Sequence, residues 1–507
     1  MLGRATGAVL IGVEACLVEV EVDLAGGLPS VSAVGLPDVA VREGIERIRS
    51  AIPHAGFTLP DGRAMINLAP AEVQKQGAGL DLPIAVALLS ADGQIQASHP
   101  EETVIAGELG LDGSVRPIRG ALSIAMEAAR VGRRRVLVPR ANAEEAALVA
   151  GIDAVSVGSL ADVAATNGAS ARVSRPDVAS ALRAAEAGRS SHDLADVRGQ
   201  ALARRALEVA AAGGHHLLLS GPPGSGKSML AQRLPGILPG MTPDEALEVT
   251  RIWSASGLSR GLVATRPFRS PHHGISFAGL TGGGLRLRPG EISLATHGVL
   301  YLDELPEFRR DALEGLRQPL EDGTITVVRI HASATFPSRF MLVASMNPCP
   351  CGHHGSPGGR CGCTPLEIRR YLAKLSGPLI DRFDIVVDVP PVDLAALSSP
   401  SRGEASLAVR ERVVAARERQ RERFGESGPT CNARMGPSEL DRFAPLSPAS
   451  RRLLIDACER MGLSARGFDR VRRVARTLAD LEGIEAIGPH HVAEAVQYRR
   501  ALVLGGG

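Results

Sequence analysis

The chain has 507 residues, of which 44% are hydrophobic and 3% aromatic, and its net charge is +2. This length predicts two to four domains, and the small net charge excludes a basic surface spread over the whole protein. No apolar run is long enough to span a bilayer, the N-terminus lacks the features of a signal peptide, and seven cysteines with four close together fit a reducing compartment. We therefore expect a cytoplasmic protein that makes no membrane contact.

The first 165 residues alternate between strands and helices and predict an α+β domain. A period of two at 18–23 indicates a half-buried strand. Further elements are expected as strands at 31–34 and 135–139 and as helices at 39–52, 82–89 and 121–130. This region, residues 1–165, resembles the Lon-protease or ribosomal S5-like domain that precedes the ATPase in magnesium-chelatase-like proteins.

The resembling stretch lies between Lys75 and Leu80. In Lon protease a desolvated lysine activates a serine nucleophile. Here Gly79 stands at the position that we match to the serine, and Ser123 stands where the lysine is expected. The resemblance therefore implies the fold without the protease activity.

Residues 166–192 are rich in Ala, Ser, Gly and Arg, which predicts an interdomain linker with at most a short helix at 178–187. The stretch Asp193-Leu194-Ala195-Asp196-Val197-Arg198-Gly199-Gln200 then opens a helix running to residue 212. This stretch resembles the D-V-x-G-Q segment that precedes the phosphate-binding loop of AAA+ ATPases. The resemblance implies that the backbone around Val197 lines an adenine pocket.

A glycine-rich loop follows the apolar run at 217–219 and precedes an expected helix at 229–234. Its residues form the pattern G-x-x-x-x-G-K-S, a P-loop: Gly221, Pro222, Pro223, Gly224, Ser225, Gly226, Lys227 and Ser228. Glycines let backbone N–H groups point at phosphates, and the helix N-terminus adds positive potential. Lys227 would reach the β- and γ-phosphates and the Ser228 hydroxyl would ligate Mg²⁺. The chain is therefore expected to bind ATP with Mg²⁺.

Two later apolar runs end in polar residues. The run at 298–302 ends in Asp303 and Glu304, the pattern of a Walker B motif, in which Asp303 holds Mg²⁺ and Glu304 polarises the attacking water. The run at 340–346 ends in Asn347, which fits the sensor 1 residue that orients this water. Adjacent side chains usually diverge, so we expect His272 and His273 to belong to a structural loop rather than a metal site.

Four cysteines follow in a C-x-C-x₉-C-x-C arrangement: Cys349, Cys351, Cys361 and Cys363. Four thiolates in so short a span can close a tetrahedral Zn²⁺ site, and His353 or His354 could replace one sulfur. The C-x-C spacing is tighter than the usual C-x₂-C. Four free cysteines in a reducing compartment are the alternative.

Residues 379–384 resemble the arginine-finger segment of the helicase and chelatase branch of AAA+ proteins. The resemblance implies that Arg382 enters the site of a neighbouring subunit and stabilises transition-state charge there. An ion pair between Arg382 and either Asp381 or Asp384 is the alternative.

The last hundred residues predict helices at 407–424, 450–461, 464–481 and 489–500. The first of them mixes arginines with glutamates, which is typical of a solvated helix. AAA+ lids carry a sensor 2 arginine near the start of such a helix as the third. By this resemblance we assign sensor 2 to Arg466, with Arg473 as the alternative.

Over nearly its whole length the sequence is similar to the YifB/ComM family, magnesium-chelatase-like AAA+ proteins with a Lon-like N-terminal domain. The most specific segments are 266–273, 289–294, 305–308 and 347–352. The resemblance implies an α/β fold: an S5/Lon-like domain at 1–165, a linker at 166–192, an AAA+ P-loop core at 193–395 and a helical lid at 396–507. It also implies a ring, expected as a hexamer, that hydrolyses ATP, moves on DNA and drives branch migration of recombination intermediates during natural transformation.

Two other functions stay open. A chelatase subunit would act through partner proteins, and the sequence holds no acidic or integrin-like partner-binding domain. A protease or unfoldase is disfavoured by Gly79 and Ser123. DNA-stimulated ATPase activity would separate the DNA motor from both.

A ring that moves on DNA needs cationic groups on loops facing its channel. Helicase-type AAA+ proteins place a channel hairpin between Walker B and sensor 1, and here the segment 324–335 carries Arg329 and His331 near its tip. The glycine-rich segment before Walker B adds Arg286 and Arg288. We expect Arg286, Arg288 and Arg329 to bind DNA. The alternatives are pairing with acids of the same subunit and a DNA path along the helix at 407–424.

Overall fold

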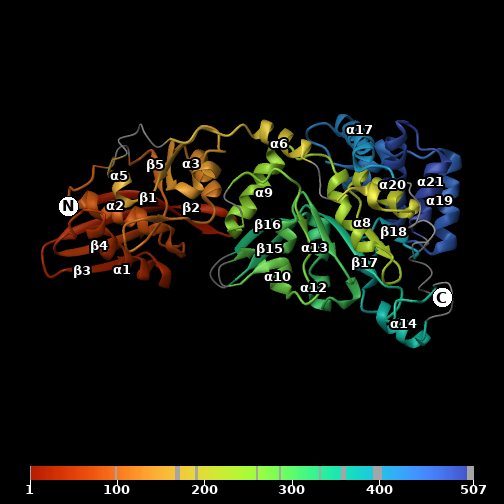
Figure 1. Cartoon of the computed structure of the whole chain (residues 1–507), viewed down its shortest axis with the longest axis horizontal. Coiled ribbons are helices and arrows are strands. Elements are labelled where there is room, and N and C mark those ends of the chain that lie inside the picture. The colour runs from red at the N-terminus through yellow and green to blue at the C-terminus, as the bar shows by residue number, and fades with distance from the viewer. Residues whose placement is uncertain are drawn as a thin grey trace.

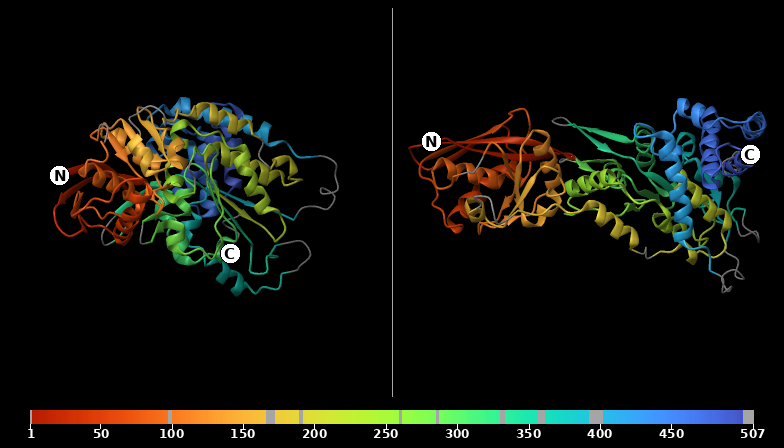
Figure 2. Two further views of the ribbon diagram at one scale, coloured as in Figure 1. Left: turned by 60° about the vertical axis from the view of Figure 1, so that its left-hand side comes forward. Right: turned by 90° about the horizontal axis from the view of Figure 1, so that it is seen from above.

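The computed structural model describes residues 2–96, 100–165, 172–188, 192–258, 261–284, 287–329, 333–355, 361–391 and 402–499. The molecule is elongated, with the N-terminal sheet at one end, a parallel sheet in the middle and C-terminal helices at the other end (Figures 1 and 2). None of the described helices combines the length and the hydropathy needed to cross a membrane.

The N-terminal part is built on a four-stranded sheet in the order β1-β2-β4-β3. Its strands are β1 (Leu2–Ile11), β2 (Glu14–Ala25), β3 (Ser30–Val34) and β4 (Arg63–Ala69). The expected alternation is confirmed, because Val18, Val20 and Val22 are fully buried. The helices α1 (Val39–His54) and α2 (Asp81–Ala91) pack on each other, and α2 packs on β1 and β2.

A second, parallel sheet in this part has the order β5-β8-β9. Its elements and their neighbours are β5 (Thr103–Ile105), β6 (Glu108–Leu109), β7 (Val115–Arg116), α3 (Ala121–Arg130), β8 (Arg135–Pro139), α4 (Ala143–Ala146), β9 (Asp153–Val157) and α5 (Leu160–Ala165). The sequence-based ranges for α3 and β8 are confirmed.

The central part is a five-stranded parallel sheet in the order β11-β14-β17-β10-β18. Its strands are β10 (Leu217–Ser220), β11 (Phe268–Arg269), β14 (Val299–Leu302), β17 (Met341–Met346) and β18 (Ile385–Asp388). Both faces are covered, since Leu217 and Leu219 join one hydrophobic cluster and Leu218 joins another. This explains the continuous apolar run before the P-loop and confirms the expected α/β class.

Helices and short strands surround this sheet. They are α7 (Ala201–Gly213), α8 (Lys227–Arg233), α9 (Pro243–Ser256), α10 (Phe277–Thr281), β12 (Gly282–Gly283), β13 (Arg288–Pro289), α11 (Glu291–Leu294), α12 (Arg310–Glu314), α13 (Arg317–Asp322), β15 (Thr324–Val328), β16 (Ser333–Pro337), α14 (Pro365–Leu372) and α15 (Gly377–Ile380). β15 and β16 form the expected antiparallel hairpin.

The C-terminal helices are α17 (Ser406–Phe424), α18 (Pro437–Phe443), α19 (Pro448–Met461), α20 (Ala465–Glu482) and α21 (Pro489–Gln497). The expectation that α17 is a solvated helix is wrong for one of its faces. Val409, Val413 and Ala416 are buried against α7 and α20. Two of its arginines form ion pairs with acids of those helices, Arg412 with Glu208 and Arg423 with Asp480.

The N-terminal part packs on the central part through the turn between β1 and β2 and through α3. Gly12 has a φ of +68°, and a Cβ there would lie 2.7 Å from the Cβ of Ala334 on β16. α3 packs on α9 of the central part, and the Gly120 N–H just before α3 donates to Ser254 O at 3.2 Å. Within the N-terminal part, the Ser123 hydroxyl on α3 donates to Val13 O at 2.6 Å. The expected linker helix is α6 (Val178–Ala187). It packs on the central part, because Val178 and Leu182 join an apolar cluster with residues of α9.

Candidate nucleotide-binding site

The P-loop connects β10 to α8 at the carboxyl edge of the parallel sheet. Gly224 and Gly226 have φ values of +74° and +87°, and a Cβ at either would meet no atom within 4 Å. The loop is therefore an open cradle whose backbone conformation favours glycine. The hydroxyl of Ser225 is buried and has no hydrogen-bond partner among the described residues. These features fit the binding of phosphate oxygens by backbone N–H groups and a hydroxyl.

Lys227 lies under this loop and is 9% exposed. Its Nζ donates hydrogen bonds to Gly221 O at 2.7 Å, Pro222 O at 2.9 Å and Asn347 Oδ1 at 3.1 Å. Burial lowers the pKa of Lys227, and the carboxylates of Asp303 and Glu304 oppose this shift. The structure thus brings together the P-loop lysine and Asn347, which are 120 residues apart.

Ser228 and Asp303 face each other across the gap between α8 and β14. The Ser228 hydroxyl donates to Asp303 Oδ2 at 2.8 Å, and the Ser345 hydroxyl donates to Asp303 Oδ1. Burial raises the pKa of Asp303, but the hydrogen bonds from Ser345 and Ser228 outweigh it, so the pKa lies below its usual value. An ionised carboxylate beside a hydroxyl is a donor set that suits Mg²⁺.

Glu304 has a φ of +54°, in the left-handed region that residues other than glycine rarely adopt. Its backbone N–H donates to Asp303 Oδ1 at 3.1 Å, and its side chain is 56% exposed. The Glu304 carboxylate is therefore open to solvent at the end of β14. His273 lies nearby, with its Nδ1 3.8 Å from Glu304 Oε2.

The segment around Val197 reaches the P-loop through Gln200. Val197 is buried, and its N–H donates to Leu194 O at 3.0 Å. Gln200 Nε2 donates to Ser225 O at 3.2 Å and to Pro390 O at 2.7 Å. The D-V-x-G-Q stretch therefore lies beside the phosphate cradle, where an adenine pocket is expected.

Arg382 lies at the opposite edge of the same sheet. Asp384, just before β18, donates its N–H to His216 O, just before β10, and the two strands are parallel. Arg382 is 5% exposed, pairs with Glu321 and also donates to Pro378 O at 3.2 Å. Among the described residues the ion-pair partner of Arg382 is Glu321, whereas the two acids offered by the sequence pair elsewhere, Asp381 with Arg499 and Asp384 with Arg470.

Arg466 and Arg473 lie with Arg382 at this amino edge, in a cleft of about 330 Å³. Five arginines line it: Arg382, Arg434, Arg466, Arg470 and Arg473. The Arg466 side chain is 66% exposed and its Nη1 lies 3.9 Å from Glu321 Oε1, whereas Arg473 Nε donates to Met435 O at 2.9 Å. Burial lowers the pKa of Arg473. Of the two sensor 2 candidates, Arg466 is the one open to solvent.

The cysteines expected to bind zinc are close together. The sulfur atoms of Cys349, Cys351, Cys361 and Cys363 all lie within 4.8 Å of one another, next to Asn347 in the chain.

Two of the three arginines expected to bind DNA lie side by side in the described part of the chain. Gly283 pairs with Arg288 across β12 and β13, and the Arg329 guanidinium lies 3.2 Å from where a Cβ of Gly283 would be. Both arginines are exposed, and neither forms an ion pair with a residue that the structure describes. Arg286 and His331 lie outside the described residues.

Sequence reasoning assigned no role in this site to several of its groups: Tyr301, Ser345, His273, Glu321 and Gln200. Ser345 and Tyr301 hydrogen-bond to each other at 3.1 Å inside two otherwise apolar strands. A polar residue near the end of a buried strand is the signal that could have pointed to Ser345. Glu321 carries no such signal.

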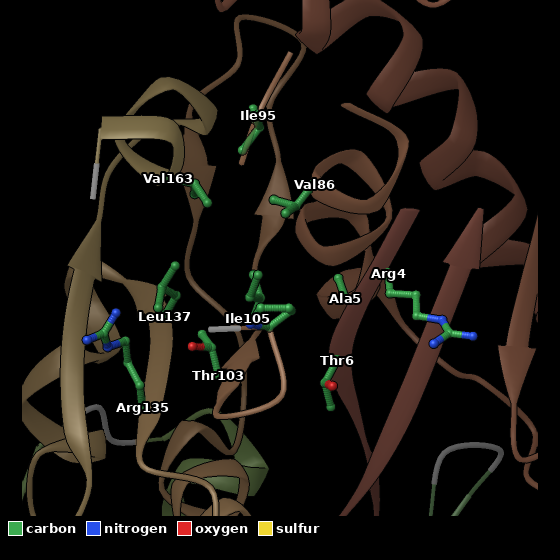
Figure 3. Close-up of a pocket in the computed structure, with 11 residues that line it drawn as sticks. Arg4, Ala5, Thr6, Val86, Ile95, Thr103, Ile105, Arg135, Leu137 and Val163 are labelled. Atoms are coloured by element: carbon green, nitrogen blue, oxygen red, sulfur yellow. The ribbon is translucent and has the colours of Figure 1, made fainter. Parts of the chain in front are cut away.

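A separate pocket in the N-terminal part is too small to be a nucleotide site. It has a volume of about 30 Å³, enough for one or two water molecules. Figure 3 shows it between β1 and β5, with Val86, Ile105 and Leu137 among the apolar side chains that line it.

Comparison with known proteins places this site in a family. Three family descriptions match the chain: "Subunit ChlI of Mg-chelatase" over residues 20–142, "Magnesium chelatase, subunit ChlI" over 193–397 and "Magnesium chelatase, subunit ChlI C-terminal" over 403–499. The competence protein ComM of Haemophilus influenzae is 43% identical over 498 residues, 97% of this chain and 96% of that protein.

YifB of Salmonella typhimurium is 44% identical over 495 residues, 96% of this chain and 95% of that protein. A more distant match is the probable DNA helicase MCM9 of Oryza sativa subsp. indica, 26% identical over 173 residues, 34% of this chain and 21% of that protein. The chain therefore belongs to the YifB/ComM family of magnesium-chelatase-like AAA+ ATPases.

Proposed function

We propose that this protein is an ATP-driven DNA motor that works as a ring, with each ATPase site completed by a neighbouring subunit. The observation that carries the proposal is the division of charged groups between two edges of one sheet. The P-loop, Asp303 and Glu304 lie at the carboxyl edge, whereas Arg382 and Arg466 lie at the amino edge. A head-to-tail interface brings such edges together, and repeated rotation closes it into a ring. We expect a hexamer.

Within one site, the P-loop N–H groups and Lys227 would bind the triphosphate, and Val197 would line the adenine pocket. Ser228 and Asp303 would hold Mg²⁺, which neutralises charge on the β- and γ-phosphates when it is bound. Glu304 accepts a proton from the attacking water, and Asn347 orients that water. The neighbouring subunit's Arg382 and Arg466 stabilise the charge on the transferred phosphoryl group.

The DNA part of the proposal is supported by Arg288 and Arg329. Both are exposed and unpaired among the described residues, and they lie together at the tips of two hairpins that follow the P-loop in sequence. Unpaired guanidinium groups on such tips can follow a phosphate backbone regardless of base sequence. The name of the distant MCM9 match agrees with a DNA role.

We further propose the domain division given by the sequence, with an S5/Lon-like domain at 1–165, a linker at 166–192, an AAA+ core at 193–395 and a helical lid at 396–507. The first domain would lack protease activity. Ser123, at the position matched to the catalytic lysine, is 3% exposed and is engaged by Val13 O. Its hydroxyl therefore ties α3 to the turn between β1 and β2 within the same domain.

The natural substrate that we propose is a branched recombination intermediate, as suits a relative named for competence. The test is strand exchange by the purified protein on three- and four-stranded DNA with ATP, together with ATPase rates with and without DNA. We expect DNA-stimulated hydrolysis and ATP-dependent branch migration. An ATPase rate that ignores DNA, with no strand exchange, would instead favour a chelatase-type or protein-remodelling role.

A further inference from the structure

The loop that follows Asn347 brings four thiols to one point. The Cys349 sulfur lies 3.4 Å from that of Cys351 and 3.7 Å from that of Cys361, and the Cys351 and Cys361 sulfurs are 3.7 Å apart. Cys363 completes the group. Four sulfurs at about 2.3 Å from one zinc ion would stand about 3.8 Å apart at the corners of a tetrahedron. The observed spacing therefore matches a single ion.

Neither of the simpler states explains this arrangement. A disulfide needs an S–S distance of about 2.0 Å, and all four cysteines are free. Four neutral thiols have no strong attraction that would gather them, since S–H groups are weak donors. In addition the backbone N–H of His354 donates to the Cys349 sulfur at 3.3 Å. Such N–H groups around the sulfurs are the usual support of a metal-bound thiolate.

The ligand set is four sulfurs and no imidazole. The ligand atoms that come within 4.8 Å of one another at this place belong to the four cysteines, with neither His353 nor His354 among them in the described chain. Four thiolates in a tetrahedron select zinc over magnesium or calcium, which prefer oxygen. Cys349 is fully buried and the other three are reached from solvent, so an ion can enter.

This cluster is in direct contact with the nucleotide site. Gly352, just after Cys351, has a φ of +82°, and a Cβ there would lie 2.4 Å from Pro223 Cδ in the P-loop. Its N–H donates to Cys349 O at 3.0 Å, which closes the turn between the first two cysteines. Asn347, two residues before Cys349, receives the hydrogen bond from Lys227.

We propose that Cys349, Cys351, Cys361 and Cys363 bind one Zn²⁺ ion, and that this ion holds the loop so that Gly352 packs on Pro223 and Asn347 stays beside Lys227. On binding, the four thiols release their protons to solvent and no electron is transferred. The metal site stands on its own geometry, whereas its effect on turnover rests on the ATPase proposed above.

Metal analysis of protein purified without chelator tests the site directly. We expect about one zinc per chain in the wild type and in the control Cys458→Ser, which changes a cysteine on α19 outside the cluster. Cys351→Ser, at the exposed ligand, should lose the ion. Replacement of zinc by cobalt should give the visible bands of a tetrahedral thiolate complex. A wild-type protein without metal, or with iron in place of zinc, overturns the proposal.

Thiol titration needs no variant and covers the case in which Cys351→Ser fails to fold. The wild type should expose the four cluster thiols to a thiol reagent only after a zinc chelator is added. Four thiols that react at once in the native protein overturn the site. For the positioning role, zinc-depleted wild type should keep binding a fluorescent ATP analogue while its turnover falls by about a hundredfold, the cost of a shift of about 1 Å in a catalytic group. Unchanged turnover after proven zinc loss overturns the positioning role alone.

Discussion

Arg382 and Glu321 form an ion pair in which the guanidinium side is 6% exposed and the carboxylate side is 50% exposed. Arg466 approaches the same carboxylate. One acid at the end of α13 therefore holds both arginines at the amino edge of the sheet within a single chain. In the proposed ring the phosphate oxygens of a neighbour's nucleotide would take the place of Glu321, because they accept the same guanidinium N–H groups.

Arg382→Ala should bind ATP normally and hydrolyse it poorly, because the arginine acts on a neighbour's site. A removed arginine finger costs about a thousandfold or more in turnover. The sharper measurement mixes Arg382→Ala with Glu304→Gln protein. Mixed rings contain some sites with an intact Glu304 and an intact neighbouring Arg382, so activity should partly recover. No recovery at any ratio would mean that Arg382 acts within its own chain or only in folding.

Lys227→Ala should abolish ATP binding, because backbone N–H groups alone must then hold a triphosphate with about four negative charges. Calorimetric titration measures the loss. Lys374→Ala is the matched control, since Lys374 is exposed and pairs with Glu307 at 3.3 Å. If Lys227→Ala bound ATP as well as the control, the P-loop lysine would have another role.

Glu304→Gln should keep ATP affinity and slow hydrolysis by about a hundredfold to ten-thousandfold, because only the group that accepts the proton is lost. Steady-state phosphate release and analogue binding measure the two properties separately. Glu307→Gln, three residues on, should keep the wild-type rate. Wild-type turnover in Glu304→Gln would assign the base elsewhere.

The joint replacement of Arg286, Arg288 and Arg329 by Ala should leave basal ATPase intact and remove its stimulation by DNA. The salt dependence of DNA binding should become flatter by about one unit of slope for each lost phosphate contact. Arg309→Ala is the control, because that exposed arginine pairs with Asp311 at 3.0 Å. Unchanged affinity and slope in the triple variant would move the DNA path to another surface.

The buried network around His297 predicts a pH-dependent stability. Burial lowers the pKa of His297, but hydrogen bonds to Glu245 and Glu248 outweigh it, and the folded-state pKa lies above 6.5. Because the folded state holds this proton more tightly, its stabilisation is present below pH 6.5 and is lost as the pH rises through the folded pKa. The denaturant concentration at the midpoint of unfolding should therefore be lower at about pH 9 than at about pH 6.

The same network behaves in the opposite way in acid. Burial raises the pKa of Glu245, yet His297 and Arg266 bring it down to about 2, so its contribution is lost only as the pH falls towards that value. His297→Gln should remove the loss of stability between about pH 6 and about pH 9, and it should also weaken the contribution of Glu245 in acid, because His297 is one of the groups that lower the pKa of Glu245. If this variant still lost stability as the pH rose from about 6 to about 9, another group would be responsible for the effect.

Local chemistry decided which parts of the site the sequence could predict. The P-loop and the acids after β14 are continuous in sequence, and their function demands fixed spacing. Helix and strand ranges such as 121–130 and 135–139 followed from apolar periodicity. The order of strands does not follow from periodicity, because β17 lies between β10 and β14. The sequence therefore could not show that Lys227 meets Asn347 or that Arg382 lies at the opposite edge.

Ion-pair partners were the least predictable feature. For Arg382 the sequence offered the neighbouring Asp381 and Asp384, but the partner is Glu321, 61 residues away. In α17 the mixed charges suggested solvent exposure, whereas Arg412 and Arg423 form ion pairs with acids of α7 and α20. A charge pattern along one helix carries no information about the charges that other helices bring to it.

Gly12 lies in close contact with Ala334 and Phe336, and this contact joins the turn of β1 and β2 to the hairpin of β15 and β16. The side chains of Ala334 and Phe336 lie directly against this glycine, and Val13 next to it is buried in the same apolar cluster. β1 runs ten residues from that turn, about 34 Å of stiff strand. A change in the tilt of the hairpin would therefore be passed along β1 to the far end of the N-terminal sheet.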